Sequence, residues 1–387
     1  MMIALVALTA LYAGALLLLG SGLRKLKPGY SLEQPKVSVI IAARNEETHI
    51  ATCLRALLNQ TYPNAKRQFI VVDDRSEDRT ADIVRSFSER YKNILLLQIK
   101  DRKAGIAPKK RALDSGIRRA TGEIIMTTDA DCQPGRFWIA EMVKFFEPDV
   151  GMIAGFCPYH SPKAPAPFWK RILSLDYFAM ASVAAASAGL NVPISCCGGN
   201  LAYRKKVYDQ IGGFKAIANW VSGDDDFFLE EVRERTNWKI HYAVLDKTFV
   251  PTASPENFSD FFQQRLRYAS KGRHYKPPVT LALSAVFLMN LFIVAGIPFL
   301  VNPNVLAFWS LGILIKGLAE YTFLKRSSRT FRLPFQRGPF LFTFLIHPVY
   351  IVTAVILSLF LNFSWKGERY SKKINPTPCH LTNSKLS

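Results

Sequence analysis

Two aspartates separated by a single residue offer the clearest chemistry in this sequence. Asp129 and Asp131 directly follow the apolar run of residues 123–127. Carboxylates at this spacing after an extended segment project to the same side, where they can hold a hard divalent cation through oxygen ligands. Such a cation can neutralise a diphosphate. For this pair alone, a solvated turn or a helix cap is the alternative interpretation.

A second pair of acids closes another apolar run. Asp73 and Asp74 follow residues 69–72, and the polar segment 43–46 closes a third run in the same way. The second pair could also cap the next helix, because the following Arg-Ser-Glu-Asp is typical of a helix N-terminus. The occurrence of such clusters at successive strand ends favours a shared ligand site.

Three consecutive acids, Asp224, Asp225 and Asp226, provide candidates for a general base. A neutral alcohol is a poor nucleophile, so a transfer reaction at its oxygen needs a carboxylate that takes the proton. Adjacent carboxylates repel one another, and at least one pKa should be raised unless cations compensate. The alternative is that Asp224 only caps a helix over residues 227–235.

These residues are expected to lie on an α/β domain. Short β-branched runs alternate with amphipathic stretches, which is typical of a parallel sheet covered by helices. Strands are expected at 37–43, 69–72, 94–98, 123–127 and 150–155, and helices at 46–58, 78–91, 108–120 and 136–146. In such sheets the ligand lies beyond the C-terminal strand ends, where the polar clusters fall.

Seven segments in this order and spacing resemble the family 2 glycosyltransferases with a GT-A fold. They are 37–47, 71–80, 109–116, 128–131, 197–204, 222–226 and 264–268. The resemblance covers about residues 36–275. It implies a Rossmann-like GT-A domain, a nucleoside-diphosphate-sugar donor and a divalent cation, Mg²⁺ or Mn²⁺.

The resemblance also implies roles for single residues. The base is Asp225 when the segment is aligned on Gly223, with Asp224 as its neighbour, and the cation ligands are Asp129 and Asp131. The donor is expected to contact Ala43, Asn45, Glu46, Asp73, Asp74, Lys109, Asp129, Gln264 and Arg267. The acceptor is expected to contact Asn200 and Tyr268.

Two of these assignments have alternatives. Lys109 could belong to a solvated basic face of its helix. Residues 264–268 match a Gln-x-x-Arg-Trp pattern with Tyr268 in place of Trp, and they could also form an amphipathic helix at a membrane surface.

The distribution of charge predicts a membrane protein. The chain has 387 residues and a formal net charge of +20, yet residues 1–23, 277–315 and 338–365 contain no charged side chain. A membrane span needs about 20 apolar residues. Residues 1–23 are expected to be an uncleaved anchor because basic residues follow them, which places the next domain in the cytoplasm. Two further spans are expected at 279–301 and 305–323.

If the third run, 338–365, crosses the membrane from the cytoplasm, the basic tail 366–387 would lie outside, which the charge rule disfavours. A break at His347-Pro348, giving a re-entrant hairpin, is one way to resolve this conflict. The stretch 168–185 is either an interfacial helix or a core helix.

The prediction is therefore a multi-pass protein of the cell (inner) membrane, with an anchor at 1–23, a cytoplasmic GT-A domain at 36–275, a helical membrane region at 277–365 and a basic tail at 366–387. The expected activity is inverting sugar transfer to a membrane lipid or a growing polysaccharide. The alternatives are a polyprenyl-phosphate monosaccharide transferase and a non-catalytic membrane subunit with partners in a synthase complex. The basic charge is explained by the spans and by membrane lipids, so no nucleic-acid partner is expected.

Overall fold

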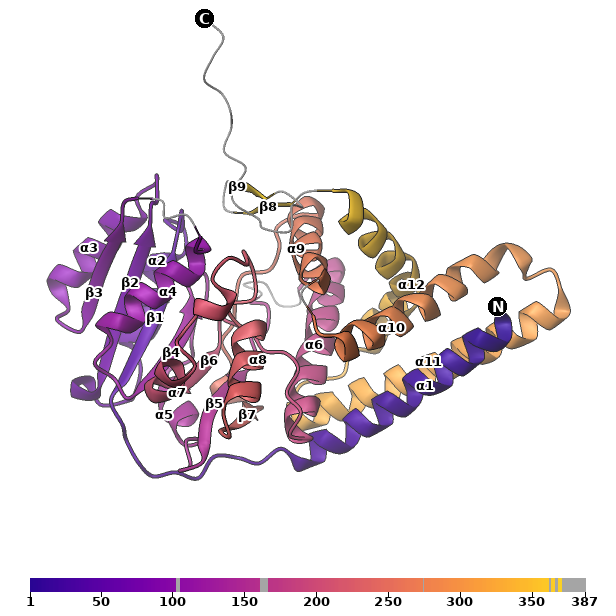
Figure 1. The fold of residues 1–387 in the computed structure, drawn as a ribbon, viewed down its shortest axis with the longest axis horizontal. Coiled ribbons are helices and arrows are strands. Elements are labelled where there is room, and N and C mark those ends of the chain that lie inside the picture. Colours follow the sequence, from indigo (N-terminus) through magenta and orange to yellow (C-terminus); the bar gives the residue numbers. More distant parts are fainter. Residues whose placement is uncertain (102–104, 161–165, 274, 362, 366–367, 371–387) are drawn as a thin grey trace, which may run out of the picture.

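The β-branched apolar runs form one seven-stranded sheet (Figure 1). The structure is a computed structural model, and it describes residues 1–101, 105–160, 166–273, 275–361, 363–365 and 368–370. The strand order is β3-β2-β1-β4-β6-β5-β7. The strands are β1 (Val37–Ala43), β2 (Arg67–Asp74), β3 (Ile94–Ile99), β4 (Ile124–Asp129), β5 (Val150–Gly155), β6 (Leu201–Arg204) and β7 (Lys239–Ala243).

The sheet is parallel over β3, β2, β1 and β4, as the alternation of strands and helices predicts. Strand β6 runs antiparallel to both of its neighbours, and the sequence pattern missed both β6 and β7. Ala43 pairs with Asp73, and Ala42 pairs with Asp129. This register brings the polar ends of β1, β2 and β4 to one edge of the sheet.

Five helices of this domain are close to the expected segments: α2 (Ile50–Leu58), α3 (Thr80–Arg90), α4 (Pro108–Arg119), α5 (Trp138–Val143) and α8 (Asp226–Arg235). Helix α7 (Lys205–Gln210) was not expected. Helix α2 begins four residues later than expected, because the residues before it are held in a turn: the Glu46 N–H donates to Thr80 Oγ1 at 2.8 Å.

Helix α4 lies unusually close to the sheet. A Cβ at Gly116 would lie 2.5 Å from Cγ2 of Ile40 on β1, so a glycine is required for this approach. The N-terminus of α4, which carries Lys109, is thereby fixed against the C-terminal end of β1.

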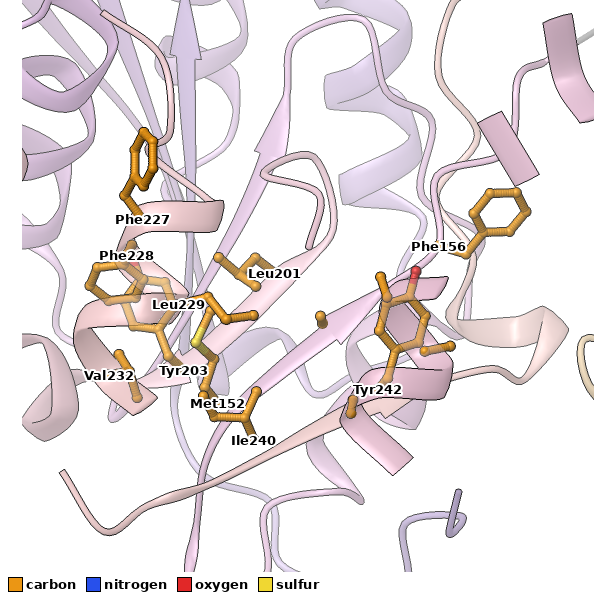
Figure 2. Packing of buried hydrophobic residues seen from close by; sticks show 14 of the residues in the cluster. Met152, Phe156, Leu201, Tyr203, Phe227, Phe228, Leu229, Val232, Ile240 and Tyr242 are labelled. Atoms are coloured by element: carbon orange, nitrogen blue, oxygen red, sulfur yellow. The ribbon is translucent and has the colours of Figure 1, made fainter. Parts of the chain in front are cut away.

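Helix α8 is fixed by its apolar face. Phe228, Leu229 and Val232 are buried against the strands at the far side of the sheet, and Figure 2 shows them facing Tyr203 and Met152. The rings of Tyr203 and Phe228 are 4.8 Å apart. Burial of three large side chains on one face stabilises α8 by several kcal/mol, at about 1.5–3 kcal/mol each. The acids at its N-terminus therefore have a fixed position.

Long apolar helices occupy the other side of the molecule (Figure 1). They are α1 (Met2–Gly22), α6 (Phe168–Gly189), α10 (Pro277–Gly296), α11 (Pro303–Thr330) and α12 (Arg337–Phe360), and the shorter α9 (Phe258–Ser270) precedes α10. The five long helices are each long and apolar enough to cross a membrane. Helix α6 is also half buried: part of its surface packs inside the protein, as in a core helix, and the rest is exposed, as in an interfacial helix.

Helices α1 and α11 lie side by side, α6 lies between this pair and the sheet, and α9 packs against α12 (Figure 1). The Tyr12 hydroxyl of α1 donates to Glu320 of α11 at 3.0 Å, and Arg326 donates to the carbonyl of Gly20 at 3.3 Å. The C-terminal ends of both helices therefore meet on the side of the sheet domain.

Helix α12 corrects the expectation of a re-entrant hairpin. It continues through Pro348 without a break. A proline inside a helix removes one hydrogen bond, and contacts of α12 with α6, α9 and α10 hold the helix together around it. The chain then returns to α9 through the strand pair β8 (Phe363–Trp365) and β9 (Glu368–Tyr370). Most of the expected tail, 371–387, lies outside the described residues.

Candidate active site

A cavity of about 210 Å³ lies at the polar edge of the sheet, between the ends of β1 and β4 and the helices α4, α8 and α9. Most of the polar and charged residues singled out in the sequence line it. They include Glu46, Asp74, Lys109, Asp129, Asp131, Asp224, Asp225, Gln264, Arg267 and Tyr268, and Lys271 joins them.

Asp129 and Asp131 lie together at the end of β4. One ligand atom each of Asp129, Asp131 and the Cys132 thiol lie within 4.8 Å of one another. Thr252 Oγ1 donates to Asp131 at 3.4 Å. Two carboxylates at this separation fit a hard divalent cation, for which a thiol is the weakest ligand of the three. The donor set therefore suits Mg²⁺ or Mn²⁺.

Lys109 reaches into the middle of the cavity. Its Nζ lies 2.8 Å from Asp129 Oδ1 and 3.0 Å from Asp224 Oδ2, and its side chain is 18% exposed. Burial alone would lower the pKa of Lys109, but the two carboxylates raise it well above its usual value. The lysine is a fixed cation in the cavity, so the alternative of a solvated basic face does not fit.

Asp225 and Asp226 share a second lysine. Lys271 Nζ lies 2.6 Å from Asp226 Oδ2 and 3.2 Å from Asp225 Oδ1. Burial would raise the pKa of Asp225, but Lys271 and Lys109 hold it well below its usual range. Burial raises the pKa of Asp226 in spite of the neighbouring lysine. Of these two acids, Asp226 is therefore the one with a raised pKa, and burial is its main cause.

The cap of α8 differs from the expected one. The helix begins at Asp226, and the Asp225 side chain, not that of Asp224, accepts from the Asp226 N–H at 2.7 Å. Gly223 precedes the acids with a φ of 83°, a left-handed conformation that favours glycine. The turn frees Asp224 to pair with Lys109.

Of the second acidic pair, Asp73 and Asp74, only Asp74 lines the cavity among the described residues. Asp74 lines the cavity and accepts from Arg111 at 2.7 Å and from Arg75 at 3.0 Å. Asp73 is buried and, among the described residues, is not part of the lining.

The predicted donor contacts in the segment after β1 also differ in whether they line the cavity. Ala43 and Glu46 line the cavity, whereas among the described residues Asn45 is not part of the lining. The side chain of Asn45 instead accepts from the Glu77 N–H at 2.9 Å and holds the loop after β2.

Helix α9 presents one face to the cavity. Gln264, Arg267, Tyr268 and Lys271 are spaced three and four residues apart, which places them on the same side of a helix. The Tyr159 hydroxyl donates to Gln264 Oε1 at 3.1 Å.

Asn200 does not reach the cavity in the part of the chain that the structure describes. Its side chain is fully buried, it donates to the carbonyls of Phe156 and Thr248 at 3.0 and 2.8 Å, and it accepts from the Trp138 indole at 2.9 Å. These bonds use its polar atoms inside the protein, so the expected acceptor contact is not supported by its position.

Among the lining residues that the sequence interpretation missed are Lys271, Tyr159 and Tyr177. Lys271 lies seven residues after Gln264, beyond the matched segment 264–268. Tyr159 and Tyr177 stack on each other with ring centroids 4.7 Å apart. They come from the end of β5 and from α6, and no spacing in the sequence connects them to the site.

Comparisons with known proteins agree with this arrangement. Residues 38–212 match the model of the family described as Glycosyl transferase family 2. The Probable glycosyltransferase YdaM of Bacillus subtilis (strain 168) is 31% identical over 250 residues, which are 63% of this chain and 56% of that protein. The poly-beta-1,6-N-acetyl-D-glucosamine synthase of Staphylococcus epidermidis is 24% identical over 309 residues, 76% of this chain and 69% of the synthase.

A solved structure shares the fold over nearly the whole chain. The mannosyltransferase PcManGT from Pyrobaculum calidifontis, in complex with GDP-Man and Mn²⁺, superimposes with a TM-score of 0.60 at 22% identity, covering 93% of this chain and 99% of that one. The fold is thus the mixed α/β, Rossmann-like sheet of the GT-A type. The resemblance to the family 2 glycosyltransferases is therefore confirmed, with the family model covering residues 38–212. It spans little more than half the length of the Bacillus relative.

Proposed function

We propose that the chain is an inverting glycosyltransferase that moves a sugar from a nucleoside-diphosphate donor to a membrane lipid or a growing glycan. The observation that carries this proposal is the convergence of Asp129, Asp131 and Asp225 with the face of α9 on one cavity. The family supports sugar transfer as the class of reaction.

The proposed base is Asp225. It takes the proton of the acceptor hydroxyl while the acceptor oxygen bonds to the anomeric carbon and the bond from that carbon to the diphosphate breaks. Attack from the face opposite the leaving group inverts the configuration. Asp224 lies next to the base and holds Lys109, so its role in the proposal is to orient that lysine.

The leaving diphosphate is matched by positive charge. A divalent cation held by Asp129 and Asp131 would supply Lewis-acid stabilisation of the leaving group. Lys109 and Arg267 line the same cavity and would donate to the diphosphate oxygens. The solved mannosyltransferase with GDP-Man and Mn²⁺ supports both a nucleotide sugar and a divalent cation.

The nucleoside is proposed to lie at the ends of β1 and β2. Ala43, Glu46 and Asp74 line this part of the cavity. Asp73 lies behind it, and its Oδ1 has no hydrogen-bond partner among the described residues. A buried acceptor without a partner is costly, and an N–H of the donor base would satisfy it.

The acceptor side is proposed to lie along α9 and α6. Tyr268 offers an aromatic face there, and Tyr159 and Tyr177 add two more. Aromatic faces suit the apolar face of a sugar ring, so a glycan or glycolipid end fits this side. The names of the staphylococcal poly-N-acetylglucosamine synthase and of a beta-monoglucosyldiacylglycerol synthase, 34% identical over 113 residues, support acceptors of these two kinds.

Helices α1, α10 and α11 are proposed to span the inner membrane, with the sheet domain in the cytoplasm. Large apolar side chains are exposed on α1, α10 and α11, among them Leu11, Leu281 and Leu314. Such a surface is costly in water and favourable in lipid. Basic residues at the ends of α1 and α11 meet on the domain side, which the positive-inside rule assigns to the cytoplasm.

The proposed division of the chain follows from this arrangement. It has an anchor at 1–23, a catalytic domain at 36–275, a membrane region at 277–365 and a tail at 366–387. Because β8 contacts α9, the chain after α12 returns to the side of the catalytic domain. Both ends of α12 then lie on this side, so the proposal does not count α12 as a span, and a tail that starts on this side agrees with the charge rule.

The test is a screen of labelled nucleotide sugars with extracted membranes, followed by sizing of the product. The proposal expects transfer from one donor class into lipid-linked or polymeric material, in the presence of Mg²⁺ or Mn²⁺. A single added sugar would indicate the polyprenyl-phosphate type of transfer, and a ladder would indicate a polymer. Folded protein that transfers no sugar from any donor would contradict the proposal.

A further inference from the structure

Lys271 lies just beyond the C-terminal end of α9 and reaches across the cavity to the N-terminus of α8. It is 7% exposed and contacts Asp225 at 3.2 Å and Asp226 at 2.6 Å. Helix α9 also carries Gln264 and Arg267, which are proposed to face the donor. Lys271 therefore connects this helix with Asp225, the proposed base.

Asp226 acts as the anchor for this lysine. Its Oδ1 accepts from the Ser195 hydroxyl at 2.9 Å and from the Cys196 N–H at 3.0 Å, and its Oδ2 accepts from Lys271. Both oxygens are therefore occupied, and Asp226 is buried below the cavity lining. This leaves the ammonium of Lys271 at a fixed place beside Asp225.

Asp225 is held from three directions. Its Oδ1 accepts from the Asp226 N–H at 2.7 Å and from Lys271, and its Oδ2 accepts from the Gly198 N–H at 3.3 Å. The backbone bonds come from rigid parts of the fold. The contact with Lys271 is the one that adds a charge.

We propose that Lys271 is a positioning residue for sugar transfer: it holds the side chain of Asp225 in place and compensates its negative charge. This inference rests on the proposed function, in which Asp225 is the base. It adds a role for a residue that the motif resemblance leaves out.

The charges around Asp225 decide what the loss of Lys271 would do. The titratable and charged groups that face Asp225 are Lys109 and Lys110 of α4, Asp224 and Asp226, Cys196 and Cys197, Tyr275, and Lys271 itself. Lys109 is already shared with Asp129 and Asp224. Without Lys271, burial and the neighbouring carboxylates would prevail, and the pKa of Asp225 would rise.

A raised pKa gives a prediction with a definite sign. The base must be ionised to take a proton, so activity is lost as the pH falls through its pKa. If that pKa is raised, the acidic limb of the pH profile moves to higher pH. A variant without the ammonium should therefore recover activity as the pH is raised.

The test compares pH profiles of kcat/KM for the full chain, purified in detergent. In K271M and K271Q, the acidic limb is expected to shift upward by at least about one pH unit. At pH 7, where Asp225 stays ionised, kcat/KM is expected to fall by about tenfold or more because the base is no longer held in place. K271R retains the charge and should keep the limb near its wild-type position. K276M is the matched control, because Lys276 is half exposed and contacts Glu230 and Glu234 on the surface.

The outcomes separate the inference from the function on which it rests. K271Q keeps a hydrogen-bond donor, so it provides the test if K271M does not fold. Wild-type turnover together with an unshifted limb in a folded neutral variant overturns the inference alone, as does a shift of equal size in K271R. A wild-type chain that transfers no sugar overturns both the inference and the proposed function.

Discussion

The ammonium nitrogen of Lys109 lies 2.8 Å from Oδ1 of Asp129, a residue that would also hold a divalent cation. The same nitrogen lies 3.0 Å from Asp224, so Lys109 connects the end of β4 with the acids before α8. A cation held by Asp129 would compete with Lys109, and the displaced ammonium would then be free to meet the diphosphate of the donor.

Replacement of Lys109 by Met should therefore have two opposite effects. Binding of Mn²⁺ in the absence of donor should become tighter, because Asp129 loses its competitor. Binding of the nucleotide sugar should weaken by about tenfold or more, since a hydrogen bond to a charged group contributes about 1.5–3 kcal/mol. Titration of Mn²⁺ followed by electron paramagnetic resonance, and titration of the donor, would measure both. Weaker binding of Mn²⁺ to folded K109M would contradict the competition.

The cation prediction concerns Asp131. The D131N variant should need a concentration of Mn²⁺ or Mg²⁺ at least about tenfold higher for half-maximal turnover, because one of two charged oxygen ligands is lost. Chelation with EDTA should stop turnover of the wild type, and added cation should restore it. The exposed Asp82 provides the control D82N. Full activity of the chelated wild type would show that the reaction proceeds without the cation.

A stability prediction concerns the back of α9. Arg265 points away from the cavity face and forms a buried ion pair with Asp176 of α6, and its guanidinium lies 4.9 Å from the ring of Phe261. Removal of one partner of a buried pair costs about 3–5 kcal/mol, because the other charge is left without compensation. R265M should lower the midpoint of thermal unfolding clearly, whereas R265M combined with D176L should lower it less. Additive losses in the double variant would show that the two charges are independent.

The sequence predicted the fold well where local pattern decides it. Strands β1 and β5 have the expected bounds, since both are continuous apolar runs between polar segments. The clusters after β1, β2 and β4 were expected together, and the parallel register does bring Asp129 and Ala43 to one edge.

The remaining parts of the site depend on tertiary contacts. Asn200 matched a motif, but only the structure shows that its amide is used in buried hydrogen bonds. Lys271 lies outside the matched segments, and its carboxylate partners are 45 and 46 residues away in the sequence. A break at Pro348 was one of the possibilities, and the packing of α12 on its neighbours overrides that local preference.

The central claim is that Asp225 removes the proton of the acceptor, and the D225N variant tests it most directly. Asparagine keeps the shape of the side chain but cannot take a proton at neutral pH. Loss of a general base should slow transfer by about 10²-fold or more. The affinity for the donor should stay within about threefold of the wild type, because donor contacts come from other residues. The measurement is single-turnover transfer of labelled sugar by wild type, D225N and the control D82N, together with donor titrations. Transfer by D225N that is at least about 100-fold slower, with donor binding retained, is the predicted result; transfer at the wild-type rate would contradict the account.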